Sequence, residues 1–191
     1  MTRLLLAAII LIGGLANGEA ENLDICAACH GEDGSGTGLP YVPIIAGTPT
    51  AHLEEALFAY QDGARKCVGV PVMCEAIAPL SNADILELAR HYSAMQRISS
   101  GEEFDATLAT AGKLIHEEHC AKCHVMPDDE DAEFALGIPL NGQRSAYLRL
   151  ALGAYMTGDR ETLIAAMAEK LQLLDQDKIE ALVNYYASYS P

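Results

Sequence analysis

The stretch Cys26-Ala27-Ala28-Cys29-His30 occurs again as Cys120-Ala121-Lys122-Cys123-His124, ninety-four residues further along the chain. C-x-x-C-H is the attachment signature of a c-type haem. Two cysteines three residues apart lie on one face of a helical turn, so both sulfurs can reach the vinyl edges of one porphyrin. The histidine that follows can then bind the iron as the proximal ligand. The sequence therefore predicts two covalently bound haem c groups, attached at Cys26, Cys29, Cys120 and Cys123.

The first residues resemble an export signal, which we expect to span residues 1–20. An apolar run of about twelve residues, Leu4 to Leu15, fits the core of a signal peptide and is short for a membrane span. The alternative is an uncleaved anchor, but two glycines stand near the end of the run. Haem attachment to C-x-x-C-H also belongs outside the cytoplasm. We therefore predict a periplasmic protein without stable membrane insertion.

Acidic residues outnumber basic residues by 27 to 12, for a formal net charge of −15. Such a charge argues against nucleic acid or an anionic membrane as a partner. It suits docking to a basic patch on a redox protein, which would speed the encounter and make its rate fall with salt. Acidity can also serve solubility alone, and charge by itself does not separate these two interpretations.

Self-comparison shows that the mature chain consists of two copies of one unit. Residues 51–65 run beside residues 146–160, and residues 80–92 run beside residues 174–186. Each copy has roughly 75–90 residues, a size that usually needs a cofactor or a covalent staple for stability. The expected boundaries are a first domain at residues 21–97, a linker at residues 98–105 and a second domain at residues 106–191.

The pattern within each copy is helical and no alternating strand pattern is present, so we predict an all-α fold. Residues 50–62 carry apolar side chains at helical spacing, and Ser145 is a candidate N-cap for the matching helix. Ser81 followed by Asp84 resembles a capping box, with Asp175 as the equivalent cap. The segment before the second C-x-x-C-H is long enough for a full helix, whereas cleavage of the signal leaves a shorter one before the first.

The repeat also identifies candidates for the second axial ligand. Met73 and Met167 are ninety-four residues apart, and each lies seven residues before the leucine that precedes the final helix of its copy. A histidine–methionine pair closes the iron site, raises its potential and suits electron transfer. A methionine in a loop at this place can reach the haem face opposite the histidine, although methionine also commonly fills cores. We therefore predict His30, Met73, His124 and Met167 as the iron ligands.

Four further histidines are less suited to bind iron. His52 and His91 align with tyrosines in the other copy, which indicates packing positions. His116 and His119 precede the second motif on the same predicted helix, and we expect them to point to solvent. A bis-histidine haem is the alternative, without a feature that favours it.

Each proximal histidine needs its other ring nitrogen held, usually by a backbone carbonyl. Pro43 is placed to supply this carbonyl in the first copy. Pro139 is the nearest match in the second copy, displaced by one residue.

Two further cysteines, Cys67 and Cys74, have no match in the second copy. In an oxidising compartment a disulfide is their expected state, with a pair of free thiols as the alternative. The bridge would clamp the loop that ends at Met73 and would make the first haem site more rigid.

The whole pattern resembles the dihaem cytochromes c of the cytochrome c4 type. The shared features are two C-x-x-C-H units in tandem, each followed by a glycine-ended segment, a helix, a methionine loop and a final helix. Residues 113–125 and 167–171 are similar to the dihaem cytochrome subunit of flavocytochrome c sulfide dehydrogenase. The resemblance implies two tandem class I cytochrome c domains related by pseudo-twofold symmetry. The Cys67/Cys74 pair and the short first helix depart from this pattern.

These features predict an electron carrier rather than an enzyme. The most specific role that the resemblance implies is to accept electrons from a flavoprotein that oxidises sulfide. The alternative is a free shuttle between a membrane complex and a terminal oxidase. A dihaem peroxidase or a thiosulfate-oxidising haem enzyme would need an open or unusual iron site. We expect the two units to account for the whole mature chain, which leaves no output domain for a haem-based sensor.

Overall fold

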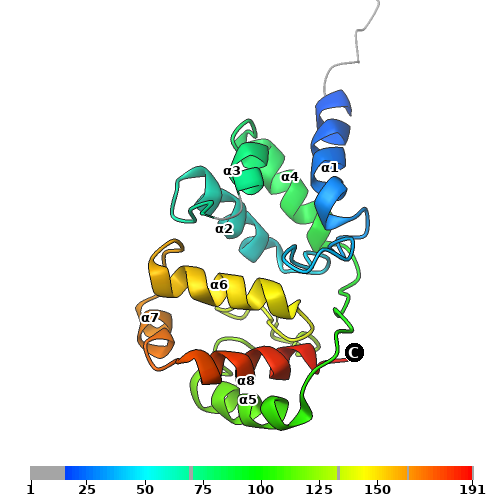
Figure 1. Cartoon of the computed structure of the whole chain (residues 1–191). Coiled ribbons are helices and arrows are strands. Elements are labelled where there is room, and N and C mark those ends of the chain that lie inside the picture. The colour runs from blue at the N-terminus through cyan, green and yellow to red at the C-terminus, as the bar shows by residue number, and fades with distance from the viewer. Residues whose placement is uncertain (1–15, 69–70, 133, 163, 191) are drawn as a thin grey trace, which may run out of the picture.

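The computed structural model describes residues 16–68, 71–132, 134–162 and 164–190, with side chains from residue 22 onward. The regular elements in this part of the chain are all helices, which confirms the all-α prediction. Figure 1 shows the first four helices in one half of the molecule and the last four in the other. The helices are α1 (Ala16–His30), α2 (Thr50–Gln61), α3 (Pro71–Ile77), α4 (Asn82–Ser93), α5 (Ala106–His119), α6 (Ser145–Thr157), α7 (Ala165–Leu171) and α8 (Gln176–Ala187).

The N-terminal segment is only partly described. Residues 1–15, which hold most of the predicted signal peptide, lie outside the described residues, so the signal peptide and its cleavage stay predictions. Within the described ranges, none of the helices combines the length and the apolar composition that a membrane crossing needs.

The two halves repeat one pattern of helices. The starts of α2 and α6 are ninety-five residues apart, and those of α3 and α7, and of α4 and α8, are each ninety-four residues apart. Each half has its own core. In the first half α4 packs on α2, and in the second half α8 packs on α6. This confirms two tandem units, while the residue boundaries of the domains stay predictions.

The final helix of each half begins where the sequence indicated. The hydroxyl of Ser81 accepts from the backbone N–H of Asp84 at 3.2 Å, and the Asp84 carboxylate accepts from the backbone N–H of Ser81 at 2.8 Å. This reciprocal pair is a capping box. Asp175 caps α8 by accepting from the backbone N–H of Lys178 at 2.9 Å.

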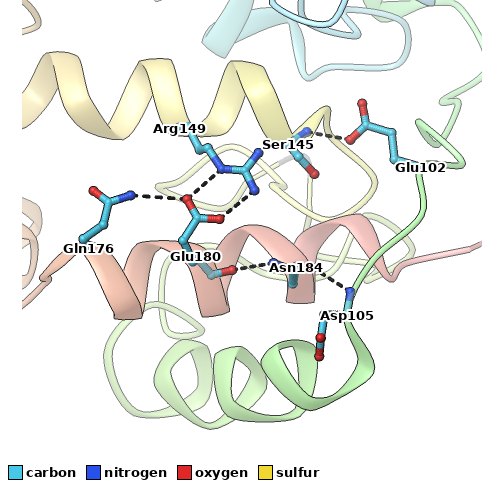
Figure 2. Close-up of polar contacts among 7 residues, drawn as sticks. All are labelled: Glu102, Asp105, Ser145, Arg149, Gln176, Glu180 and Asn184. Atoms are coloured by element: carbon cyan, nitrogen blue, oxygen red, sulfur yellow. Dashed lines mark hydrogen bonds and ion pairs between the residues drawn. The ribbon is translucent and has the colours of Figure 1, made fainter.

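The predicted N-cap of α6 is wrong. Ser145 is already the first helical residue, and Arg144 occupies the cap position without a side-chain cap bond. The carboxylate of Glu102, from the segment between the halves, accepts from the backbone N–H of Ser145 at 2.8 Å (Figure 2). The free N–H at the start of α6 is therefore satisfied by a residue distant in sequence. No local pattern could indicate such a contact.

Helices α5 and α8 cross at very short range in the second half. Gly112 is buried at the crossing, and a Cβ atom there would lie 2.0 Å from the carbonyl oxygen of Ala181. In the first half, the position that corresponds to the buried Ala181 is the exposed Glu87. The two final helices therefore differ at this position, which is buried under α5 in the second half and exposed in the first.

The Gly112→Ala variant is expected to destabilise the holoprotein by about 1–3 kcal/mol, the usual cost of overpacking. The added methyl group would meet backbone rather than a movable side chain. Gly153→Ala is the matched control, because Gly153 lies inside α6 and an added Cβ there meets nothing within 4 Å. Helix propensity predicts that the control is neutral or gains up to about 1 kcal/mol. Denaturant unfolding checks both, and equal midpoints would contradict the close crossing.

The halves meet through a contact in which matching residues pair with each other. Arg65 and Arg160, which correspond in the repeat, form an isolated antiparallel β-bridge. Two backbone hydrogen bonds flank this bridge and are equivalent by the repeat. Adding ninety-five to the first-half residue number of one bond, and subtracting it from the second-half number, gives the other bond. These bonds run from Lys66 N–H to Asp159 O at 2.7 Å and from Glu161 N–H to Ala64 O at 2.8 Å. A pseudo-twofold axis therefore passes between Arg65 and Arg160, which confirms the predicted symmetry.

Two side chains of the second half also bind the loop that follows the first motif. The Gln143 amide accepts from Ile44 N–H at 2.9 Å and donates to Ile44 O at 2.8 Å. Arg144 donates to Ser35 O at 2.8 Å. Because these bonds satisfy backbone groups that the contact removes from water, they fix the first-motif loop against the second half.

Candidate haem-binding sites

The histidine of each motif is held by a backbone carbonyl. His30 Nδ1 lies 3.2 Å from Pro43 O, as predicted. His124 Nδ1 lies 2.8 Å from Ile138 O, so the matching carbonyl belongs to Ile138 and not to Pro139. The second loop is one residue longer, which shifts the register. A carbonyl accepts from a protonated Nδ1 and leaves Nε2 free to bind iron.

The surroundings of both histidines favour the neutral imidazole. Burial lowers the pKa of His30 and His124, against the smaller opposite effect of the carbonyl bonds. Neutral imidazole is the form that binds a metal. Gly137 lies against the His124 ring so closely that a Cβ there would be 2.5 Å from Nδ1. Any residue larger than glycine at position 137 would therefore clash with the His124 ring.

The six cysteines divide into two kinds. Cys67 and Cys74 form a disulfide, with Cα atoms 6.0 Å apart, as predicted. The four motif cysteines are unbridged and half-buried: Cys26, Cys29, Cys120 and Cys123. Two available sulfurs and one neutral imidazole in each motif are the donor set that haem c requires. The residues present therefore fit the group, and the four cysteines stay the predicted attachment points.

Both candidate methionine ligands lie in short helices and not in the loops that we expected. Met73 and Met167 are the third residues of α3 and α7, two seven-residue helices that correspond in the repeat. Met73 is half-buried and packs, together with Cys26, against the core of the first half. Met167 is half-buried as well. Their role as iron ligands stays a prediction, supported by this equivalence of position.

The prediction that His116 points to solvent is wrong. Its side chain is only 4% exposed, and its Nδ1 lies 3.1 Å from the hydroxyl of Tyr186 on α8. The cause is helical periodicity, since His116 is one turn beyond Gly112 and shares the face that crosses α8. His119 is largely covered too, with 19% of its side chain exposed. Of the other histidines, His52 is half-buried and His91 is exposed.

The buried position of His116 predicts acid sensitivity. Burial is the largest effect on His116 and lowers its pKa below 6.5. The unfolded chain then binds this proton more readily, so the stabilisation is complete above about pH 6.5 and is lost as pH falls towards the lowered pKa. We expect the unfolding midpoint of the holoprotein to fall with acid more steeply than that of His116→Gln. His91→Gln, at an exposed site, should keep the wild-type slope, and one common slope for all three would contradict the assignment.

Some residues around the sites received no role from the sequence. Tyr92 and Tyr186 are buried at matching positions of the final helices, and the Tyr186 side chain hydrogen-bonds with that of Cys120. Arg65 and Arg160 meet on the pseudo-twofold axis. The sequence does show that these tyrosines and arginines are identical in both copies. This identity does not reveal which residues they contact.

Comparisons with known proteins find c-type cytochromes. The chain is 37% identical over 84 residues to cytochrome c-554(548) of Halomonas halodenitrificans, a match that covers 44% of this chain and 99% of that protein. It is 27% identical over 176 residues to the thiosulfate dehydrogenase electron acceptor of Stutzerimonas stutzeri, covering 85% of this chain and 78% of the other. The solved structure of reduced recombinant cytochrome c4 from Pseudomonas stutzeri matches with a TM-score of 0.74 at 25% identity, covering 93% and 100%. No family model matches the chain.

The helical fold and the paired sites define a tandem haem protein in which each half holds one haem c. The chain belongs to the class I c-type cytochromes, in the dihaem form of the cytochrome c4 type. Its two haem c groups are covalently bound, and its function is electron transfer.

Proposed function

We propose that this cytochrome is a periplasmic carrier that accepts electrons from a flavoprotein that oxidises sulfide. The observation that carries an electron-transfer role is the pair of matching histidine sites, each held by a backbone carbonyl, in two halves that are joined by one symmetric contact. Bound haem supplies one-electron iron chemistry at each site. His30 and His124 hold the proximal positions, and Met73 and Met167 would close the opposite ones. A closed site keeps small ligands out and requires little rearrangement when the charge changes.

The identity of the donor rests on two different observations. The resemblance of residues 113–125 and 167–171 to the cytochrome subunit of a sulfide dehydrogenase supports the flavoprotein. The relative named as a thiosulfate dehydrogenase electron acceptor supports a second candidate, a thiosulfate dehydrogenase. The net charge of −15 fits a donor with a basic docking face in both cases.

Stopped-flow reduction of the ferric holoprotein separates the two donors. A purified sulfide-oxidising flavoprotein with sulfide is expected to reduce the protein faster than sulfide alone, at a second-order rate that falls with salt. A thiosulfate dehydrogenase with thiosulfate is the parallel arm, with thiosulfate alone as its control. If neither enzyme accelerates reduction while a terminal oxidase rapidly reoxidises the reduced protein, the free-shuttle alternative replaces this proposal.

A further inference from the structure

We propose that the loop after the second haem motif is a docking surface for a basic redox protein. The surface consists of two exposed apolar side chains at its centre and four consecutive exposed carboxylates at its rim: Phe134, Leu136, Asp128, Asp129, Glu130 and Asp131. These six residues are the acidic loop surface. The inference deepens the proposed function and rests on it in one respect only, namely that electrons pass to or from a protein partner.

The apolar centre of this surface is largely open to solvent. Phe134 is 82% exposed and Leu136 is 68% exposed. Leu39 and Tyr41 stand at the matching positions of the first half, ninety-five residues earlier, and are 47% and 63% exposed. Single exposed apolar residues are common, whereas grouped ones with a polar rim mark interaction sites. Because both halves keep a large apolar pair at these exposed positions, the pair is not an accident of one loop.

The rim gives the acidic loop surface a strong negative charge. Residues 125–143 hold five acidic residues and no lysine or arginine, whereas the matching residues 31–48 hold only two acidic residues. Within the described ranges, none of the four rim carboxylates forms an ion pair. Their charge is therefore available to the lysines and arginines of a partner.

The loop that carries the surface is fixed in place at two points. The backbone N–H of Gly137 donates to Cys123 O at 3.0 Å, which ties the end of the loop to the haem motif. The backbone of Ala135, between the two apolar residues, hydrogen-bonds with the His52 side chain on α2 of the first half. A surface that is already ordered loses less conformational entropy when a partner binds.

The position beside His124 suits the passage of electrons. The carbonyl of Ile138 binds Nδ1, the ring nitrogen that does not bind iron, so the loop lies on the side of the imidazole that faces away from the iron. We therefore expect Phe134 and Leu136 to stay exposed in the holoprotein. Only Gly137 separates Leu136 from Ile138, so a partner seated here contacts residues that lead directly to the predicted iron ligand.

A protein with an apolar patch framed by lysine or arginine is the occupant that fits this surface. A second copy of the chain carries the same net charge of −15 and would be repelled. An anionic membrane is disfavoured for the same reason. A basic redox protein meets both features, because it pairs with the rim carboxylates and buries the two apolar side chains.

The test is an NMR titration of the isotope-labelled ferrous holoprotein with reduced mitochondrial cytochrome c, a small lysine-rich haem protein, at low salt. The largest amide shifts are expected in the loop between Met126 and Ile138. The double variant Phe134→Ser with Leu136→Ser should raise the Kd at least about tenfold, because the apolar centre of an interface carries most of its binding energy. The control Leu108→Ser with Leu114→Ser removes two exposed apolar side chains of α5 and should keep the wild-type Kd.

A second pair of variants, matched in charge, tests the rim. Glu130→Gln with Asp131→Asn, and the control Glu103→Gln with Glu169→Gln, each remove two negative charges at exposed positions. The rim variant should lose more affinity at low salt than the control, and its Kd should depend less on salt. Unchanged haem absorption shows that each variant keeps its fold.

The docking surface is overturned if the probe does not bind, if the strongest shifts lie outside this loop, or if the variants match their controls. Such a result leaves the donor assignment untouched, because the stopped-flow comparison of the donor enzymes decides it separately. Failure of both enzymes to reduce the protein likewise leaves the docking result standing, since the titration involves no electron transfer.

Discussion

Replacing Met73 or Met167 with alanine is expected to open one of the two iron sites and to leave the other closed. Alanine has no atom that can bind iron, and each methionine belongs to a different half. The ferric variant should lose the methionine-to-iron charge-transfer absorption of one haem, about half of the total, and should bind added azide or imidazole at that haem. Its reduction potential should also fall, because the thioether ligand favours the ferrous state.

Met156→Ala is the matched control for this experiment. Met156 lies on α6, is 52% exposed and has no methionine counterpart in the first half. The control should keep the full absorption band and bind no added ligand. If Met73→Ala and Met167→Ala behave like the control, the axial assignment is wrong and a bis-histidine or open site takes its place.

Replacing Cys120 and Cys123 together with serine is expected to yield a chain with one covalent haem. Serine cannot form the thioether bond, and the second half buries few large side chains apart from those on α8. The second half should therefore lose its ordered core, because a unit of this size depends on its cofactor. The mass of the mature protein should fall by one haem, and the haem absorbance per chain should fall by about half.

The disulfide provides the control for the cysteine variant. Cys67→Ser with Cys74→Ser removes the same number of sulfurs but lies outside both motifs. This double variant should keep two covalent haems. Two haems retained in the Cys120/Cys123 variant would contradict the attachment sites.

Much of the fold and of the haem sites could be predicted from local patterns. The repeated C-x-x-C-H motif and the repeated helix pattern indicated two tandem units, and Ser81 and Asp175 indicated where the final helices begin. The carbonyl of Pro43 followed from its place after the first motif. These features depend on neighbours within a few residues or on a direct match between the copies.

The features that were missed depend on contacts between distant segments. From the sequence alone we expected His116 to face solvent, but α8 crosses its helix and covers it. Glu102 satisfies the start of α6 from forty-three residues away. The pairing of Arg65 with Arg160 requires the symmetry axis, which the repeat implies but does not place.

The most direct test of two haems, each held between histidine and methionine, is the proton NMR spectrum of the reduced holoprotein. We predict two sets of methionine methyl signals, both shifted far upfield by a haem ring current. Met73→Ala should remove one set and Met167→Ala the other. Fewer than two sets in the unaltered protein, or one set that survives both substitutions, would contradict the account.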